Sequence, residues 1–308
     1  MRPSREIIKR VFFGQAINAL PRGEMSLSDG LVKALAGSNT ASFDAQIEVM
    51  ADLGFDYCCI STLAGREGKA LLPPDFKQKV RAAERAGLFV FALVGGVLSD
   101  LMNEMGWVSL LVSMKRSPGH YARAAQLRAE RESRVIRACK DAGVSGIVIG
   151  DDLGYSAGPY ISPDDYNRLV APAHEVLTQA SAQLPCVLHS DGAIGKLLHS
   201  IRRAGFAGIH PADGILPRDA HEAGLVVLGG FPSAELCLRS PAQVYARALR
   251  YAREAEWPHI LGSSTGFLGE EVPAANLRAL YQALGDVERQ LYPDAGRGSW
   301  GSGPGACH

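Results

Sequence analysis

The sequence predicts a single (β/α)8 (TIM) barrel, and three observations support this fold class. The chain has 308 residues, a length that suits one barrel of this kind. Short apolar runs rich in Val, Ile and Leu alternate with segments of helical periodicity, and such runs are typical of strands buried on both faces. The alternation continues along the chain without an obvious linker. A doubly wound open sheet is the alternative, and it fits less well because no G-x-G-x-x-G motif follows the first strand.

The strands are predicted at eight apolar runs, which span residues 23–27, 55–61, 88–94, 146–150, 185–189, 208–210, 226–229 and 259–262. Between them, apolar residues recur every three or four positions, as in 43–53, which indicates helices with one buried face. The other main helices are predicted at 124–142, 163–182, 194–204, 241–256 and 273–284. A glycine precedes several of the strands and is the residue that best ends a helix in a left-handed conformation: Gly87, Gly143, Gly205 and Gly224.

Two regions do not follow the alternation. Residues 95–119 are too long for a simple connection and contain Trp107, so we expect helices that pack into the core, cover the barrel mouth or contact a partner. Residues 295–308 are rich in glycine and poor in apolar residues, which predicts disorder. We therefore expect the barrel over residues 1–290 and a disordered tail over 291–308.

The composition argues against several classes of partner. Lys plus Arg and Asp plus Glu each number 32, whereas a nucleic-acid or anionic-membrane partner normally requires a basic excess. No apolar run approaches the roughly 20 residues that span a bilayer, and the N-terminus does not resemble a signal peptide. The six cysteines include no C-x-x-C pair. We expect a cytoplasmic enzyme that acts on a small-molecule substrate.

The most informative motif is His189-Ser190-Asp191-Gly192, which ends the predicted strand 185–189. In a barrel of parallel strands, the carboxyl ends of the strands carry the active site. Residues two apart on a strand point the same way, so His189 and Asp191 are expected to share a ligand or a proton. The alternative is that both residues cap the next helix.

Polar residues also follow other predicted strands. Asp151 and Asp152 follow the run 147–150, and because adjacent strand residues point to opposite faces, we expect Asp152 to face the cavity. The other interpretation is an aspartate that caps a helix. His210 precedes Pro211 and is either a functional residue or a hydrogen-bonded residue of the rim. The remaining candidates at strand ends are Glu24, Thr62, Ser263 and Ser264.

Histidine together with Asp or Glu suits zinc or another divalent ion, which these side chains bind through nitrogen and oxygen. Without a metal, the same groups could act as general acids and bases on a bound substrate. The residues alone leave both alternatives open.

Several motifs together resemble the uroporphyrinogen decarboxylase superfamily. The resemblance covers roughly residues 5–285 and implies the barrel fold of that superfamily. The motifs are Leu20-Pro21-Arg22-Gly23-Glu24, Gly150-Asp151-Asp152-Leu153-Gly154, His189-Ser190-Asp191-Gly192, Gly208-Ile209-His210-Pro211 and Ile260-Leu261-Gly262-Ser263-Ser264.

The superfamily contains two groups of enzymes, and this chain departs from both. Uroporphyrinogen decarboxylases carry an Arg-Gln-Ala-Gly-Arg motif that binds substrate carboxylates, whereas Gln15-Ala16-Ile17-Asn18 lacks both arginines. The second group comprises corrinoid-dependent methyltransferases, and those that act on thiols bind zinc through His-x-Cys and a later Cys. Here these positions are His189-x-Asp191 and Ser263 or Ser264.

The resemblance therefore implies, as the first hypothesis, a methyltransferase that acts on a small methylated or methoxylated compound. Cobalamin would be carried by a partner corrinoid protein, and zinc is the metal that the family implies. Two alternatives stay open: a decarboxylase-like lyase that uses the same residues without cobalamin, and a non-catalytic barrel that binds a ligand. Related barrels often form homodimers, and the sequence leaves the oligomeric state open.

This hypothesis gives each candidate residue a role. It assigns catalysis to His189, Asp191 and Asp152, and a metal site to His189, Asp191 and Glu24. Contacts with the substrate are assigned to Glu24, Thr62, His210, Ser263 and Ser264.

Overall fold

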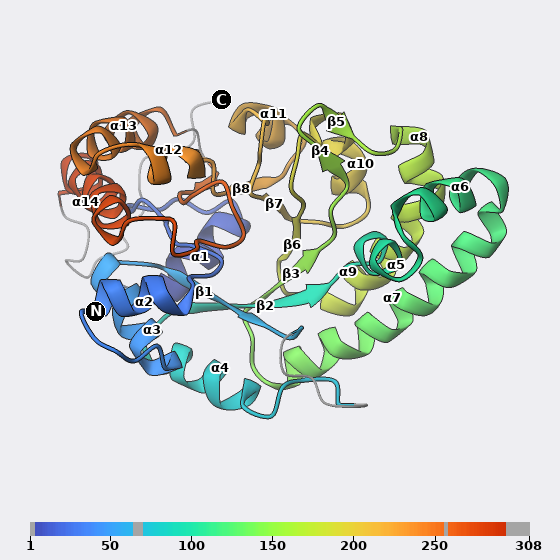
Figure 1. Cartoon of the computed structure of the whole chain (residues 1–308), viewed down its shortest axis with the longest axis horizontal. Helices are drawn as coiled ribbons and strands as arrows, with labels where there is room; N and C mark the ends of the chain where they lie inside the picture. Colours follow the sequence, from blue (N-terminus) through green and yellow to red (C-terminus); the bar gives the residue numbers. More distant parts are fainter. Residues whose placement is uncertain (1–3, 64–69, 256–257, 294–308) are drawn as a thin grey trace.

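The computed structural model describes residues 4–63, 70–255 and 258–293, and it shows an α/β fold around one parallel sheet (Figure 1). Seven strands form this sheet in the order β1-β2-β3-β6-β7-β8-β9, and each neighbouring pair is parallel. The strands are β1 (Tyr57–Ser61), β2 (Phe89–Gly95), β3 (Gly146–Gly150), β6 (Cys186–His189), β7 (Gly208–His210), β8 (Val226–Leu228) and β9 (His259–Ile260). A separate antiparallel hairpin follows β3 and consists of β4 (Gly154–Tyr155) and β5 (Gly158–Pro159).

Helices surround the sheet, with α12 to α14 gathered on one side of Figure 1 and α5 to α9 on the other. Those before β3 are α1 (Ser4–Phe12), α2 (Asp29–Ala36), α3 (Phe43–Leu53), α4 (Phe76–Arg85), α5 (Leu98–Met105), α6 (Trp107–Arg116) and α7 (Pro118–Asp141). Those after β5 are α8 (Pro163–Asp165), the π-helix η1 (Tyr166–Val170), α9 (Ala171–Ser181), the 3-10 helix η2 (Gly195–Leu197), α10 (Leu198–Arg203), α11 (Pro217–Glu222), α12 (Ser233–Leu238), α13 (Pro241–Glu254) and α14 (Ala274–Leu291).

The predicted α/β alternation is confirmed. Seven of the eight predicted strands form, and the helix predicted at 43–53 has these bounds in the structure. The four glycines expected before strands all have positive φ angles. The long segment 95–119 forms α5, α6 and the start of α7, and the helix predicted at 163–182 contains one π-helical turn. Residues 294–308 of the predicted tail lie outside the described residues.

The prediction of a strand at 23–27 is wrong. Only single parallel bridges occur there, between Arg22 and Leu261 and between Leu27 and Leu268. The backbone pairing is interrupted after Gly23, where the amide of Ser263 donates to the carboxylate of Glu24, and it resumes only at Leu268, which bonds to Ser26 and Ser28. The sheet is therefore open between β1 and β9, and these seven strands do not form the closed eight-stranded barrel.

Two separate groups of buried side chains show how the sheet curves. The larger group fills the space between the sheet and the surrounding helices. The smaller group lies on the concave face of the sheet and includes Tyr57 of β1, Val148 of β3, Val187 of β6 and Ile260 of β9. Helix α1 contributes Ile8 to this second group. Successive strand residues alternate between the two groups, as the period of two requires.

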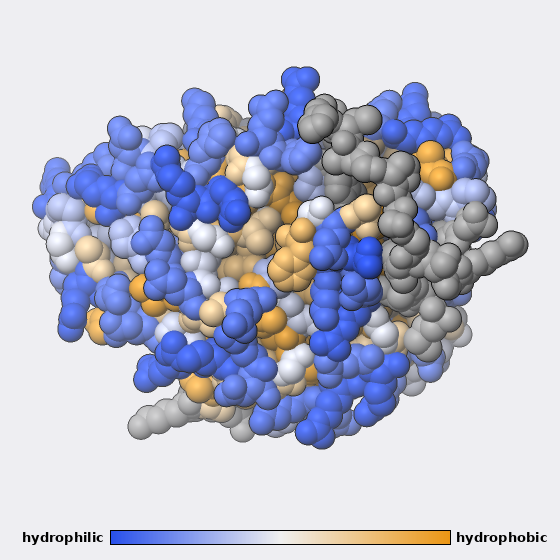
Figure 2. Space-filling model, turned by 180° about the vertical axis from the view of Figure 1, so that it is seen from behind, coloured by the Kyte–Doolittle hydropathy of each residue, from blue (hydrophilic) through white to orange (hydrophobic). Residues whose placement is uncertain are grey.

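The face of the molecule opposite to the view of Figure 1 is mostly polar. Seen from behind, the molecule shows hydrophilic side chains over most of its area and apolar ones gathered near the middle of that face (Figure 2). Within the described ranges, no helix combines the length and the apolar character needed to cross a membrane.

Candidate active site

His189 and Asp191 lie at the carboxyl end of β6. His189 lies two residues after Val187, so its ring is on the concave side of the sheet. Its Nδ1 atom is 2.8 Å from Nδ1 of His210, at the end of the adjacent strand β7. Its Nε2 atom is 3.9 Å from Oδ1 of Asp191, whose side chain is 67% exposed. The pair expected from the sequence is therefore brought together, with His210 behind it.

Asp152 completes the group from the neighbouring strand. It follows β3, and its Oδ1 atom accepts a hydrogen bond of 3.0 Å from the backbone amide of Asp191. One possible ligand atom from each of Asp152, His189 and Asp191 lies within 4.8 Å of the other two. One nitrogen and two oxygen donors suit zinc or a similar divalent ion, and three protein ligands leave a position for substrate.

Burial and charge affect the titration of this group. Burial, followed by the negative charge of Asp191, raises the pKa of Asp152, although the Asp191 amide and His189 act in the opposite direction. Burial, followed by the neighbouring His189, lowers the pKa of His210 well below the usual histidine value. His210 is therefore uncharged at neutral pH, and one proton lies between the two Nδ1 atoms.

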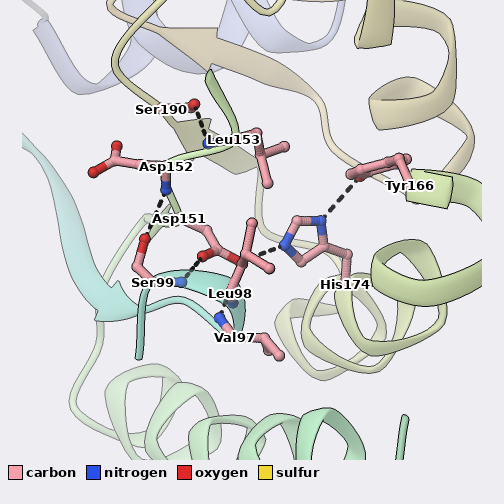
Figure 3. Close-up of polar contacts among 9 residues, drawn as sticks. All are labelled: Val97, Leu98, Ser99, Asp151, Asp152, Leu153, Tyr166, His174 and Ser190. Atoms are coloured by element: carbon pink, nitrogen blue, oxygen red, sulfur yellow. Dashed lines mark hydrogen bonds and ion pairs between the residues drawn. The ribbon is translucent and has the colours of Figure 1, made fainter. Parts of the chain in front are cut away.

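Asp151 points to the opposite side of the sheet from Asp152. Its Oδ2 atom is 2.8 Å from Nε2 of His174, and Nδ1 of His174 is 2.9 Å from the hydroxyl of Tyr166 (Figure 3). The amides at the start of α5 also donate to Asp151, among them that of Ser99 at 2.6 Å. Burial raises the pKa of Asp151, but His174 and these amides outweigh it, so the pKa lies below the usual value.

The sequence analysis predicted that Asp151 and Asp152 point to opposite faces, and the structure places them so. The carboxylate of Asp151 accepts from the first amides of α5, so it caps that helix, which was the other interpretation. The sequence analysis missed His174, because its contact with Asp151 depends on how the helix of His174 packs against the end of β3. Figure 3 also shows two serines that hold the backbone next to Asp152. Ser99 Oγ accepts from the Asp152 amide and Ser190 Oγ from the Leu153 amide, each at 2.8 Å.

A cavity of about 280 Å³ opens beside His189 and Asp191. Its other lining residues are Met25, Leu93, Thr265, Gly266 and Phe267, so its walls combine apolar and polar groups and carry no lysine or arginine among the described residues. Gly266 lies directly on the His189 ring, since a Cβ atom at this position would be 2.7 Å from Cε1 of the imidazole. The segment after β9 therefore packs against the candidate catalytic histidine.

The segment 95–119 reaches the same edge of the molecule. Trp107 at the start of α6 packs edge-on against Tyr160, with ring centroids 4.0 Å apart. Partial burial, followed by the charges of Asp152 and Asp191, raises the pKa of Tyr160, which places its hydroxyl in the field of both carboxylates. The expectation that this segment covers the mouth is consistent with the position of Trp107, and Tyr160 is a further rim residue that the sequence analysis missed.

The structure does not bring Glu24 together with His189 and Asp191. Gly23 and Met25 face the concave side, so Glu24 faces the helices, where it accepts from Ser263 Oγ at 2.5 Å and from Tyr281 Oη at 2.8 Å. Burial raises the pKa of Glu24 to about 7, against the lowering effect of these hydrogen bonds. The third side chain beside His189 and Asp191 is therefore Asp152 and not Glu24.

Thr62 and Ser264 also have structural partners. The hydroxyl of Thr62 donates to the carbonyl of Leu93 at 2.9 Å, which extends the pairing of β1 with β2. Ser264 Oγ accepts from the Ser233 amide at 3.1 Å and lines a different cavity, of about 510 Å³. Neither residue lines the cavity at His189.

Comparisons with known proteins give one family. The family model for uroporphyrinogen decarboxylase (URO-D) matches residues 92–287. A solved methyltransferase from Methanosarcina mazei has a TM-score of 0.74 at 14% sequence identity, over 92% of this chain and 98% of that chain. A dihydrodipicolinate synthase from Rhodopseudomonas palustris has a TM-score of 0.46 at 13% identity, over 96% of this chain and 81% of that chain. No curated protein sequence matches significantly. At 14% identity, the likeness to the methyltransferase is evidence for the fold alone.

Proposed function

The chain belongs to the uroporphyrinogen decarboxylase family, and from this premise and its site we propose that it is a methyltransferase. The substrate is a small methylated or methoxylated compound, and the partner is a corrinoid protein. The observation that carries this proposal is the set of one imidazole and two carboxylates, from His189, Asp191 and Asp152, beside a small cavity with three apolar side chains in its wall.

The lining of the cavity supports methyl transfer over decarboxylation of a substrate with several carboxylates. Carboxylates in a protein site are usually paired with arginine or lysine. None of the seven described residues that line the cavity is a lysine or an arginine. Apolar walls from Met25, Leu93 and Phe267 instead suit a methyl group and the carbon frame that carries it.

The donor set fits a divalent ion such as zinc. His189 would bind it through Nε2, and Asp152 and Asp191 through one carboxylate oxygen each. The ion would act as a Lewis acid on the heteroatom from which the methyl group departs. His210 positions His189, because its Nδ1 can accept the Nδ1–H of His189 and so leave the Nε2 lone pair toward the carboxylates.

The cavity volume supports a corrinoid that stays on its partner. At about 280 Å³, the cavity lies at the low end of small-molecule sites and cannot enclose a corrin macrocycle. Cobalamin on the partner would supply the nucleophile that accepts the methyl group. The residues of this chain bind and orient the substrate, and the segment of Thr265 and Phe267 limits the access of water.

We also propose that residues 21–23 take the place of the eighth strand and complete a (β/α)8 barrel. The amide of Gly23 donates to the Leu261 carbonyl at 2.9 Å, beside β9. The carbonyl of Arg22 accepts from the Asp56 amide at 2.8 Å, beside β1. Both edges of the open sheet therefore contact this short segment.

The metal site is tested by zinc content and zinc affinity, measured by inductively coupled plasma mass spectrometry and isothermal titration calorimetry. We expect near-stoichiometric zinc in the wild type and in Glu24→Gln, and its loss in the double variant His189→Ala, Asp191→Ala. Glu24→Gln is the matched control, because it changes a carboxylate that is bound elsewhere. Equal zinc in the double variant and the wild type would refute the assignment.

The reaction is tested with free cob(I)alamin and a panel of methylated amines and methoxylated aromatic compounds. We expect at least one donor to convert cob(I)alamin to methylcobalamin, followed by its absorption spectrum, and His189→Ala to abolish the conversion. Release of carbon dioxide from carboxylated compounds, without methyl transfer, would instead favour a decarboxylase.

A further inference from the structure

We propose that a second cavity, between α3 and α14 on the helix side of the sheet, binds a small oxyanion such as a phosphate or carboxylate group. The cavity has a volume of about 360 Å³ and is lined by Arg22, Arg278, Arg289, Asp52, Gly54 and Gly285, among others. It shares no lining residue with the cavity at His189. The site is therefore separate from the candidate active site, and the inference does not depend on the proposed function.

The first observation is a buried guanidinium with one free end. The side chain of Arg22 is 8% exposed. Its Nε donates to the carbonyl of Gly54 at 3.1 Å, and its Nη1 donates to Glu288 at 3.0 Å. Within the described ranges of the chain, Nη2 has no acceptor. Arg22 lines the cavity, so an oxyanion there would accept a charge-assisted hydrogen bond from this nitrogen.

Nη2 of Arg22 points to a space that two glycines leave open. The position of a Cβ atom on Gly54 would be 3.0 Å from this nitrogen, and that of a Cβ atom on Gly285 would be 3.9 Å from it. Gly54 ends α3 with a positive φ of 71°, and this conformation by itself explains why the residue is glycine. Gly285 lies inside α14, where glycine costs about 1 kcal/mol relative to alanine. Gly285 does not have a positive φ, so its backbone conformation does not require glycine. The absence of a side chain at this position leaves the space beside Nη2 of Arg22 open.

A second guanidinium reaches the same point. The Cβ position of Gly285 is 3.5 Å from Nη1 of Arg289 as well as 3.9 Å from Nη2 of Arg22. An oxyanion seated above Gly285 would therefore lie within reach of N–H donors from both arginines. Guanidinium groups present paired donors that match the oxygens of phosphate and carboxylate groups.

The acidic residues around this cavity are already bound to arginines. Arg278 pairs with Asp52 at 2.7 Å, Arg22 with Glu288 at 3.0 Å, and Nη2 of Arg289 with Asp286. These pairs neutralise three charges, and they hold the three guanidinium groups in place. Among the described residues, Nη2 of Arg22 and Nη1 of Arg289 are the two guanidinium nitrogens that lie near Gly285.

The test is isothermal titration calorimetry at low ionic strength, with inorganic phosphate in one arm and acetate in the other. The main variant is Arg289→Gln, because this side chain is 74% exposed and its change should leave the fold intact. The matched control is Arg134→Gln, an exposed arginine of α7. We expect millimolar binding of at least one anion by the wild type, and about tenfold weaker binding by Arg289→Gln, the effect of one charge-assisted hydrogen bond.

Gly285→Leu is a second variant, which fills the space above α14 and should abolish binding. Stronger binding of phosphate than of acetate would identify a phosphate-bearing ligand, and the reverse would identify a carboxylate. The proposal is overturned if the wild type binds neither anion, or if Arg134→Gln weakens binding as much as Arg289→Gln does.

Discussion

Replacing His174 by Phe is a direct test of the buried network behind Asp152. Both His174 and Asp151 have fully buried side chains, and the two are joined at 2.8 Å. The substitution removes both ring nitrogens but retains an aromatic ring of similar size. The edge-on contact with Phe206, at 5.2 Å between centroids, can therefore persist. The change tests the polar interaction with little change in packing.

The expected loss follows from the bonds that remain. Removing the Nε2 donor of His174 leaves the buried carboxylate of Asp151 short of one hydrogen bond, which costs about 3 kcal/mol or more for a charged acceptor. Asp151 keeps the amides of Val97, Leu98 and Ser99, which keeps the loss near this lower value. The hydroxyl of Tyr166 also loses its acceptor, which adds about 1 kcal/mol. We expect the free energy of unfolding to fall by about 4 kcal/mol.

Urea unfolding followed by circular dichroism measures this loss. The control is His199→Phe, the same substitution at an exposed histidine of α10, which should change stability by less than about 0.5 kcal/mol. The double variant with Tyr166→Phe should be less destabilised than the sum of the two single changes, because the hydroxyl and the imidazole are bonded to each other. A loss no greater in His174→Phe than in His199→Phe would refute the reasoning.

Three further predictions concern the neighbouring groups. Gly266→Ala should weaken zinc binding by about tenfold or more, because the added Cβ atom would displace the His189 ring. The control is Gly119→Ala, whose Cβ atom would meet no atom within 4 Å, and its zinc affinity measured by calorimetry should equal that of the wild type. His210→Phe should weaken zinc binding by about 10- to 100-fold without unfolding the protein, and unchanged affinity would exclude its positioning role. Because burial raises the pKa of Glu24 from 4.5 to about 7, the folded state retains a proton that the unfolded chain loses between these values. Stability should therefore fall by up to about 3 kcal/mol as the pH rises through this range, and urea unfolding of Glu24→Gln should lack this dependence.

The sequence alone determined the features that depend on local periodicity. The apolar runs and the helical spacing between them predicted the parallel α/β alternation and the bounds of α3. The period of two along a strand placed His189 and Asp191 at one strand end and separated Asp152 from Asp151. These inferences succeeded because strand and helix geometry act over a few residues, within one segment of the chain.

Only the tertiary structure decided the features that depend on contacts between distant segments. The backbone pairing of the first predicted strand is interrupted where the carboxylate of Glu24 accepts from the amide of Ser263, 239 residues away in the sequence. The pairing of His189 with His210 requires two strands to lie side by side, and that of Asp151 with His174 requires a helix to pack on the sheet. A hydrogen bond is directional and acts over about 3 Å, so it depends on the packed positions of both partners, which local sequence patterns do not specify.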